Sequence, residues 1–466
     1  MARVHARPLL RPRGRAALLL LLALPAVALA RPGGGENYGG SSSSSASSSS
    51  GSDSASSHGG SGDDWGEDSI STAFTTSDLA WSLLFSAIAL YAFIDHRRGQ
   101  REWQKSQGAP APAPSVPLVD PRVADARFHS RAEELFALLN EAWFRRDLSP
   151  VRHRLSDATY QRFNTLLRIQ RQQGERNATA DNRLLGLRPL LYEQDAHFEA
   201  VHASLTAEAR DVKAPAELDD DAARAQAREA PLERYTEIWT FLRKPGARPA
   251  SLAEGTCPAC GGQMVLGETA ACAHCTAIVN SGRYDWILAE ITQAHVAFPG
   301  EPLPPGVEAL RGSDPALCRQ VLEDRGSLLF WKWVEARALR QAAPLAKVAA
   351  PDFVAALAPQ LGSASPLLNA AVGSVDLLDA EVNGAWHRAR LSVRWSAGGQ
   401  LRRSVMELQR RADAPTPAAG LATARCPACA GPLSDNGQPS CDYCGEPLAA
   451  SPRDWVLAAL EESPAT

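Results

Sequence analysis

Eight of the nine cysteines fall into two groups with the same spacing, Cys-x2-Cys-x11-Cys-x2-Cys, and the second group follows the first by 169 residues. Two thiolates separated by two residues bind a metal ion from the same side, and a second such pair completes a tetrahedral site. The pattern therefore predicts two structural zinc ions. The predicted ligands are Cys257, Cys260, Cys272 and Cys275 in the first group and Cys426, Cys429, Cys441 and Cys444 in the second.

Disulfide bonds or a redox-active Cys-x-x-Cys pair are the alternatives for these cysteines. The repeated number and spacing favour zinc, and the nearby proline and glycine residues suit a chain that turns sharply around a metal. Because four thiolates saturate zinc, we expect structural sites and not hydrolytic ones. Cys318, the ninth cysteine, has no partner in the pattern and is interpreted as a small core residue.

The repetition extends beyond the cysteines. The sequence of residues 285–289, Asp-Trp-Ile-Leu-Ala, recurs at residues 454–458 as Asp-Trp-Val-Leu-Ala, with the same shift. This indicates that a whole domain was duplicated, and a length of 466 residues supports two or three domains. The net charge of -4 gives no general basic signature, and the loops around the cysteines carry almost no positive charge, so no nucleic-acid partner is expected.

The N-terminal part has the composition of a targeting segment followed by a tether. Residues 1–30 combine five arginines with an apolar run that ends Ala28-Leu29-Ala30. This is typical of a cleaved secretory signal peptide, with an uncleaved signal anchor as the alternative. Residues 31–72 are mostly glycine and serine, a composition that predicts a disordered tether because it cannot bury enough apolar surface to fold.

A second apolar run, Leu79–Ile94, contains no charged residue and predicts a transmembrane helix over residues 74–95. A bilayer needs about 20 apolar residues, so a buried soluble helix is the alternative. Acidic residues precede the run and basic residues follow it, which places the C-terminal part in the cytoplasm. That reducing compartment favours zinc thiolates over disulfides. A proline-rich linker, residues 96–122, then leads to the folded part.

The first folded part reads as two helices followed by strands. Apolar residues recur with a helical period over Phe128–Ala142 and again over Tyr160–Leu167. Strands are predicted over Leu184–Ala209, Tyr235–Arg243 and Tyr284–Ile291. The first cysteine group therefore lies between the last two strands of an α+β domain.

The second folded part repeats this order. Helices are predicted over Ser327–Arg340 and Pro351–Leu361. Residues His387–Trp395 alternate between apolar and polar, as in a half-buried strand, and Asn383-Gly384 is a favoured hairpin turn that joins this strand to Val375–Glu381. The predicted domains are residues 123–295, with a zinc ribbon at 255–280, and residues 307–462, with a zinc ribbon at 424–448.

Only the first part carries an acidic stretch, Glu217–Asp221, between two of its strands. We expect a solvated loop there, with a partner-binding loop as the alternative.

Three short motifs in the first part carry a family resemblance. They are Arg146-Asp147-Leu148 between the helices, Glu237–Phe241 on one late strand and Trp286–Leu288 on the last. Together with the element order, they resemble the Tim44-like domain, a family that includes a tether for the mitochondrial import motor and membrane-side ribosome receptors. The resemblance implies a cone-shaped fold of the nuclear-transport-factor-two-like class, with helices packed on a curved antiparallel sheet.

The resemblance covers residues 123–295 well and residues 310–460 more weakly. In the second copy, Gln341-Ala342-Ala343 and Met406-Glu407-Leu408 replace two of the motifs. Arginine greatly outnumbers lysine, which suggests a GC-rich bacterium. We therefore expect a single-pass protein of the bacterial plasma membrane with its folded domains in the cytoplasm.

Enzyme activity is not expected. Enzymes of the wider fold class place a general base in the cone, but the sequence has no Gly-rich phosphate loop, nucleophile elbow or His-Glu-x-x-His pattern. Most of the possible bases lie beside a predicted hairpin turn, where acidic residues are usually solvated. These candidates are Glu193, Asp195, His197, His202, Asp379, Glu381 and His387.

Seven arginines crowd the helical part of the first domain, close to the predicted membrane. Anionic headgroups attract such residues, so contact with anionic lipid is expected, with an ordinary ion-paired helix face as the alternative. The arginines are Arg145, Arg146, Arg152, Arg154, Arg162, Arg168 and Arg171.

Taken together, these features predict a membrane-anchored, non-enzymatic adaptor that acts on an unidentified protein partner in protein transport or membrane-protein biogenesis. A lipid- or peptide-binding carrier or sensor, which would use apolar pockets in the cones, is the alternative function.

Overall fold

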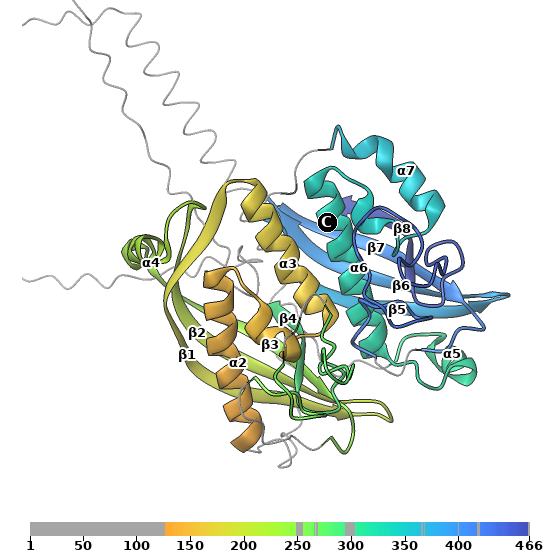
Figure 1. Cartoon of the computed structure of the whole chain (residues 1–466), viewed down its shortest axis with the longest axis horizontal. Helices are drawn as coiled ribbons and strands as arrows, with labels where there is room; N and C mark the ends of the chain where they lie inside the picture. The colour runs from red at the N-terminus through yellow and green to blue at the C-terminus, as the bar shows by residue number, and fades with distance from the viewer. Residues whose placement is uncertain are drawn as a thin grey trace, which may run out of the picture.

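The computed structural model describes residues 126–464 except 248–254, 265, 267–268, 294–302, 365–366, 368, 399 and 417–419. The predicted signal peptide, tether, membrane span and linker all lie outside these residues. Among the described residues, none of the helices is long and apolar enough to cross a membrane. Figure 1 shows two units side by side, each with helices packed on a twisted sheet. We call residues 126–293 the first half and residues 303–464 the second half.

The first half has three α-helices and a four-stranded antiparallel sheet among its described residues, with strand order β1-β2-β3-β4. Its elements are α2 (Ala126–Arg145), η2 (Ser149–Arg154), α3 (Asp157–Gln172), β1 (Glu175–Gln194), β2 (Glu199–Pro215), α4 (Asp220–Glu229), β3 (Leu232–Arg243) and β4 (Ile287–Gln293).

Aromatic side chains fill the space between α2 and this sheet. Phe128 on α2 makes edge contacts with Phe241 and Trp286, at ring-centroid distances of 5.2 and 5.6 Å. Phe136 lies eight residues further along α2 and packs against Trp239. All of these aromatic residues are buried. Such rings remove large apolar areas from water, so the space between α2 and the sheet is a packed core.

The second half repeats the layout, with strand order β5-β6-β7-β8 in a second antiparallel sheet. The predicted hairpin at Asn383-Gly384 is confirmed, since Asn383 pairs with Trp386 and Gly384 has a φ of 58°. The elements are α5 (Val307–Ser313), α6 (Arg319–Leu339), η3 (Ala343–Leu345), α7 (Pro351–Leu361), β5 (Ala371–Asn383), β6 (Trp386–Ala397), β7 (Gln400–Arg411) and β8 (Val456–Pro464).

The two halves match even in their local irregularities. Each first long helix ends next to an arginine with a left-handed backbone, Arg146 with φ 57° and Arg340 with φ 55°. In each half, the residue two positions before the next α-helix forms an isolated parallel bridge to the last strand, Leu155 to Leu288 and Ala349 to Leu457. Left-handed backbone is costly for a residue with a Cβ, so its recurrence supports a common layout.

The halves meet through α3 and α6. The side-chain amide of Gln161 donates a hydrogen bond of 2.8 Å to the buried carboxylate of Glu335, which also forms an ion pair with Arg168. Ala158 and Ile169 on α3 join the apolar core of the second half. Helix α6 is therefore enclosed by its own sheet on one side and by the first half on the other.

The expectation of a solvated loop at Glu217–Asp221 is wrong, because this stretch begins helix α4. The carboxylate of Asp219 caps the helix by accepting a 2.8 Å hydrogen bond from the backbone N–H of Ala222, and acidic residues favour the positive end of a helix. Ala223 and Ala227 anchor the helix in a small buried cluster.

The expectation for Cys318 is confirmed. Its side chain is fully buried beside Phe198 and Val321 in an apolar cluster that spans both halves. Burial also raises the pKa of the Cys318 thiol to about 12, so this residue stays a neutral core side chain.

Candidate metal centres and a pocket between the two sheets

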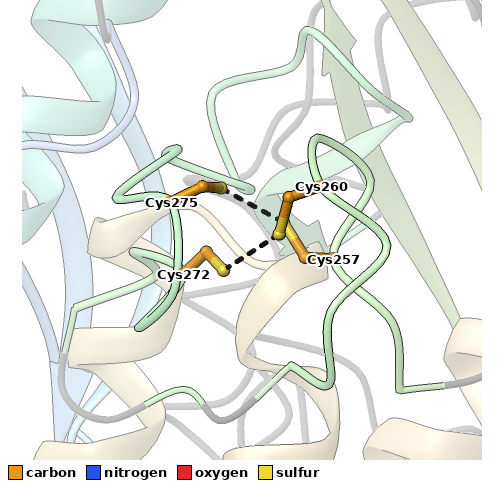
Figure 2. A group of neighbouring side chains, drawn as sticks. All are labelled: Cys257, Cys260, Cys272 and Cys275. Carbon is orange, nitrogen blue, oxygen red and sulfur yellow. Dashed lines mark hydrogen bonds between the residues drawn. The ribbon is translucent and has the colours of Figure 1, made fainter.

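Each cysteine group forms a compact cluster on the loop before the last strand of its sheet. We call these loops the first ribbon, residues 255–280, and the second ribbon, residues 424–448. Figure 2 shows the first cluster, in which the two pairs of cysteines face one another. Within each cluster, the four sulfur atoms lie within 4.8 Å of one another.

The sulfur spacing fits a zinc ion. In the first cluster, the distance from Cys257 Sγ to Cys275 Sγ is 3.8 Å and that from Cys260 Sγ to Cys272 Sγ is 3.9 Å. The corresponding pairs in the second cluster are both 3.7 Å apart. A tetrahedron with Zn–S bonds of about 2.3 Å has S···S edges of about 3.8 Å, so all eight predicted ligands are placed as a metal requires.

Backbone N–H groups in the knuckles point at the sulfur atoms. The N–H groups of Ala259 and His274 donate to Cys257 Sγ and Cys272 Sγ, both at 3.4 Å. Backbone hydrogen bonds from Cys275 and His274 lower the pKa of Cys272 to about 6. At Cys441, burial acts to raise the pKa of the thiol. Backbone hydrogen bonds from Cys444 and Tyr443 outweigh burial and lower this pKa to about 7. The backbone thus favours a thiolate at Cys272 and at Cys441, and a thiolate is the form that binds metal.

The first ribbon is joined to the rest of the first half by a buried polar cluster. Asn280, at the end of the ribbon, donates hydrogen bonds of 3.0 Å to the carbonyl of Leu155 and to the carboxylate of Asp157. The same carboxylate forms an ion pair with Arg152, and none of the three polar side chains is exposed by more than a few per cent. Asp157 also accepts a 2.6 Å hydrogen bond from the backbone of Ala424, where the second ribbon begins.

The second ribbon is held by a different side chain. The ammonium of Lys347 is buried and donates to Asn436 at 2.7 Å and to the carboxylate of Asp442 at 3.2 Å. Lys332 on α6 adds a 2.6 Å contact to Asp435 on the same loop. A cation enclosed by several acceptors makes strong hydrogen bonds, so these contacts fix the ribbon against the helices of the second half.

A pocket of about 110 Å³ lies between the two sheets. The first half contributes the face of its sheet that points away from α2, and the second half contributes the N-terminal part of α6 and the start of β5. Five carboxylates line the pocket, together with one histidine and one arginine. These residues are Glu193 on β1, His202 on β2, Glu290 on β4, Arg319, Glu323 and Asp324 on α6, and Asp376 on β5.

Burial disfavours charge on three of these carboxylates. Burial, and then the nearby Asp376, raise the pKa of Glu290 to about 7. Burial also raises the pKa of Glu323 well above its usual range, although the N–H of Leu377 donates a 3.0 Å hydrogen bond to it. Burial likewise raises the pKa of Asp324 well above its usual range, although a contact with Ser156 opposes the shift.

Two of the seven candidate bases, Glu193 and His202, meet in this pocket. The ring Nε2 of His202 lies 3.3 Å from the Glu193 carboxylate, and Nδ1 lies 3.0 Å from the hydroxyl of Thr240. The hydrogen bond from His202 lowers the pKa of Glu193. This pair lies on the face of the sheet that points away from α2, whereas enzymes of the wider fold class place a general base inside the cone.

The other candidate bases lie elsewhere. Asp195 caps the turn between β1 and β2 by accepting the N–H groups of His197 and Phe198. Asp379 forms an ion pair with Arg390, and Glu381 is exposed at the end of β5.

His387 is buried in a network of its own. Its ring nitrogens contact Ser313 at 3.2 Å and Arg410 at 3.4 Å, and Arg410 also forms an ion pair with the buried Asp314. Burial lowers the pKa of His387, with Arg410 acting in the same direction. We therefore interpret this network as structural.

The predicted surface of seven arginines is wrong for three of its members. Arg152, Arg154 and Arg162 are at most 9 % exposed. Carboxylates of Asp157 and Glu134 bind the first two, and Arg162 donates to a backbone carbonyl. Three buried guanidinium groups cannot contact lipid. The positions that remain partly exposed are Arg145, Arg146, Arg168 and Arg171.

A broader hollow of about 690 Å³ lies on the first half between α2, a bend in β1 and α4. The bend occurs where Asp181 has a left-handed backbone and the register between β1 and β2 shifts. Phe136 and Leu184 line the hollow beside the charged side chains of Glu133 and Arg224. No pattern in the sequence indicates this hollow, because it depends on the bend in β1.

Comparison with known families identifies a Tim44-like domain at residues 115–251. Among the described residues, the matched segment runs from α2 to the end of β3. The resemblance inferred from the motifs is therefore confirmed over residues 115–251, which include two of the three motifs. No curated protein and no solved structure matches the chain.

Proposed function

We propose that this protein is a membrane-anchored, non-enzymatic adaptor that binds a protein partner in protein transport or membrane-protein biogenesis. The Tim44-like domain at residues 115–251 carries this proposal. The apolar run Leu79–Ile94 would serve as the anchor, and the basic residues after it favour a cytoplasmic location for both halves. In this arrangement, a single-pass protein of the bacterial plasma membrane holds its binding surface close to the bilayer.

We also propose that the second half is a second copy of the domain, so that the two domains span residues 123–295 and 307–462. Each copy would carry one structural zinc ion bound by its four cysteines. The matched irregularities at Arg146 and Arg340 support the duplication, and the sulfur spacing supports the metal. Zinc would act by coupling metal binding to the folding of each ribbon.

The packing favours an adaptor over a carrier of lipid or apolar peptide. A carrier needs an apolar cavity, but Phe128, Phe136 and Trp239 fill the cone of the first half. The pocket between the sheets is lined by charged side chains. A protein surface such as the hollow beside α2 therefore fits the proposed function better.

Site-specific photocrosslinking in bacterial membranes tests the adaptor role. A crosslinking amino acid at Asn182 would lie in the hollow, and one at Val382 would lie on an exposed hairpin of the second half as the matched control. We expect Asn182 to capture a translocase, chaperone or ribosomal component that Val382 does not capture. Equal capture from both positions, or capture of lipid alone, would contradict the proposal.

The membrane topology is tested separately by protease protection. In spheroplasts, both halves are expected to resist an external protease, and in inverted membrane vesicles both are expected to be digested. Recovery of the chain from the soluble fraction, or digestion in intact spheroplasts, would refute a cytoplasmic, membrane-anchored arrangement.

A further inference from the structure

The pocket between the two sheets has more negative than positive groups. When ionised, its five carboxylates face one guanidinium, that of Arg319. They come from four separate elements of both halves, β1, β4, β5 and α6. The charge excess is therefore a property of the junction and not of one acidic segment.

Three of the carboxylates have a cationic or potentially cationic neighbour. Glu193 contacts His202 at 3.3 Å, and Glu323 lies 3.8 Å from Arg319. Asp376 forms a 3.2 Å ion pair with Arg394. These contacts leave Glu290 and Asp324 without an ion-pair partner among the described residues.

Of these two carboxylates, that of Asp324 is the more deeply buried. Its side chain lines the pocket and belongs to a residue that is only 5 % exposed. Neither of its carboxylate oxygens accepts a hydrogen bond of good geometry from the described residues. Its contact with Ser156 brings no positive charge, and a buried carboxylate without an ion-pair partner is destabilising, so Asp324 either holds a proton or meets a cation that enters the pocket.

The geometry favours an organic cation over a metal ion. Among the described residues, only the two cysteine clusters bring three or more ligand atoms within metal-binding distance of one another. The carboxylates of the pocket are spread around a space of about 110 Å³. Such a space exceeds what a single water needs and is sufficient for the charged end of an arginine-like or lysine-like group.

We propose that this pocket binds a guanidinium or alkylammonium group, with Asp324 and Glu290 as its counter-charges. Planar guanidinium groups bind carboxylates through paired hydrogen bonds, and the pocket offers carboxylates on opposite walls. The ligand is either a free small amine or the side chain of a basic peptide, and both present the same chemistry. This proposal does not depend on the adaptor role or on the metal centres.

Cation binding in this pocket is linked to proton release. At low pH, the raised pKa values keep Glu290, Glu323 and Asp324 protonated, and a cation must displace protons to bind. The nearby Arg162, Arg319, Arg325 and Arg394 favour ionisation of these carboxylates, whereas Asp157 and Asp376 oppose it. With a pKa of about 7 at Glu290, release of the Glu290 proton alone should raise the affinity by about tenfold between pH 6 and pH 8.

Isothermal titration of the full-length protein in detergent tests the proposal. The probes are agmatine, an acetylated Ala-Arg-Ala amide and the corresponding Ala-citrulline-Ala amide, which has the same shape without the charge. We expect one equivalent of agmatine or of the arginine peptide to bind, with the pH dependence above, and no heat from the citrulline peptide.

Two variants test the counter-charges. Asp324→Asn and Glu290→Gln should each weaken binding at pH 8 by at least tenfold, and Glu290→Gln should also flatten the dependence on pH. The matched control is Asp379→Asn, which removes a partly exposed carboxylate further along β5 that does not line the pocket and should leave binding unchanged. Unchanged thermal unfolding curves would show that the variants fold.

The outcomes separate the possible ligands. Similar affinity for agmatine and the arginine peptide indicates a small amine as the ligand, and a peptide affinity at least tenfold higher indicates an arginine side chain. The proposal is overturned if no charged probe binds at 10 mM and pH 8, or if binding survives in both variants. Equal binding of the citrulline peptide would also overturn it, because charge would then play no part.

Discussion

In the first ribbon, a buried trio of Arg152, Asp157 and Asn280 connects the metal loop to the helices. When Arg146 is aligned with Arg340 and the two cysteine groups are superposed, the equivalent residues of the second half are alanine, proline and alanine. They are Ala346, Pro351 and Ala449. The second half therefore lacks the polar connection that the first half uses.

The second ribbon is attached by charged side chains that have no equivalent in the first half. Lys347 binds Asp442 and Asn436 there, whereas the residues equivalent to Lys347 and Asp442 in the first half are His153 and Ala273. The four-cysteine skeleton is thus common to both halves, and the side chains that attach it are not. The metal cluster tolerates different surroundings because its geometry is set locally by the knuckles, while docking depends on each ribbon's own neighbours.

Replacing one cysteine in each cluster should have the largest effect. Cys272→Ser and Cys441→Ser should each reduce bound zinc from two equivalents to one, because three thiolates and a hydroxyl bind zinc far more weakly. Since metal binding is coupled to folding, the affected ribbon should lose its protection from hydrogen exchange. Native mass spectrometry and exchange measurements on the full chain would follow both quantities.

The same variants also test whether the two ribbons are independent of one another. The ribbon with intact cysteines should keep its zinc and its protection, since the two ribbons share only Asp157 among the side chains described above as attaching them. Cys318→Ser, at the buried ninth cysteine, is the control and should retain two equivalents. Loss of both metals from a single-cluster variant would show that the two ribbons fold as one unit.

Sequence alone was sufficient for features that depend on residues close together in the chain. The cysteine spacing predicted both clusters, and Asn383-Gly384 predicted the hairpin that is observed. Helix α4 was missed because the acidic run was interpreted only as charge, although Asp219 is also a typical helix cap.

Features formed by residues that are far apart in the sequence could not be predicted from it. The pocket brings together Glu290 on β4 and Asp324 on α6, and no local pattern indicates that these segments meet. The buried arginines were placed on the surface because arginine is rarely buried without a partner. Their partners, such as Asp157 for Arg152, become evident only when η2 and α3 are in place.

Asp157→Asn should have the next largest effect. The change leaves the fully buried Arg152 without its counter-charge, and breaking such a pair costs about 3–5 kcal/mol. Asp157 also contacts Asn280 and the backbone of Ala424. We therefore expect faster hydrogen exchange at the ends of both ribbons, which makes this the one substitution that couples them.

The matched control for this substitution is Asp379→Asn, because the pair of Asp379 and Arg390 lies at the surface. Exposed pairs contribute about 0–1 kcal/mol, so its unfolding curve should hardly move. Equal destabilisation by the two substitutions would mean that the buried trio does not anchor the first ribbon.

Lys347→Met should loosen the second ribbon only. Methionine keeps most of the apolar stem but removes the ammonium that binds Asp442 and Asn436, a loss of about 2 kcal/mol for hydrogen bonds to a charged group. Hydrogen exchange should accelerate in residues 424–448 and stay unchanged in residues 255–280. Lys213→Met, which removes a half-exposed pair with Glu175, should change neither ribbon.

The smallest expected effect comes from glycine substitutions at left-handed residues of the two ribbons. The residue that follows each pair of cysteines is left-handed, but the glycine alternates, with Gly261 and Thr276 in the first ribbon and Ala430 and Gly445 in the second. Left-handed backbone costs a residue with a Cβ about 1–2 kcal/mol. Replacing such a residue by glycine removes this cost, but the greater freedom of glycine in the unfolded chain offsets part of the gain in stability.

Thr276→Gly should therefore stabilise the first ribbon and Ala430→Gly the second, each by about 0.5–1 kcal/mol. The reverse changes, Gly261→Ala and Gly445→Ala, should destabilise by a similar amount through the backbone alone, because no atom lies within 4 Å of the added Cβ. Competition with a zinc chelator, followed for each ribbon by hydrogen exchange, measures these shifts. If Ala430→Gly stabilised the first ribbon as much as the second, the independence inferred from their different attachments would be lost.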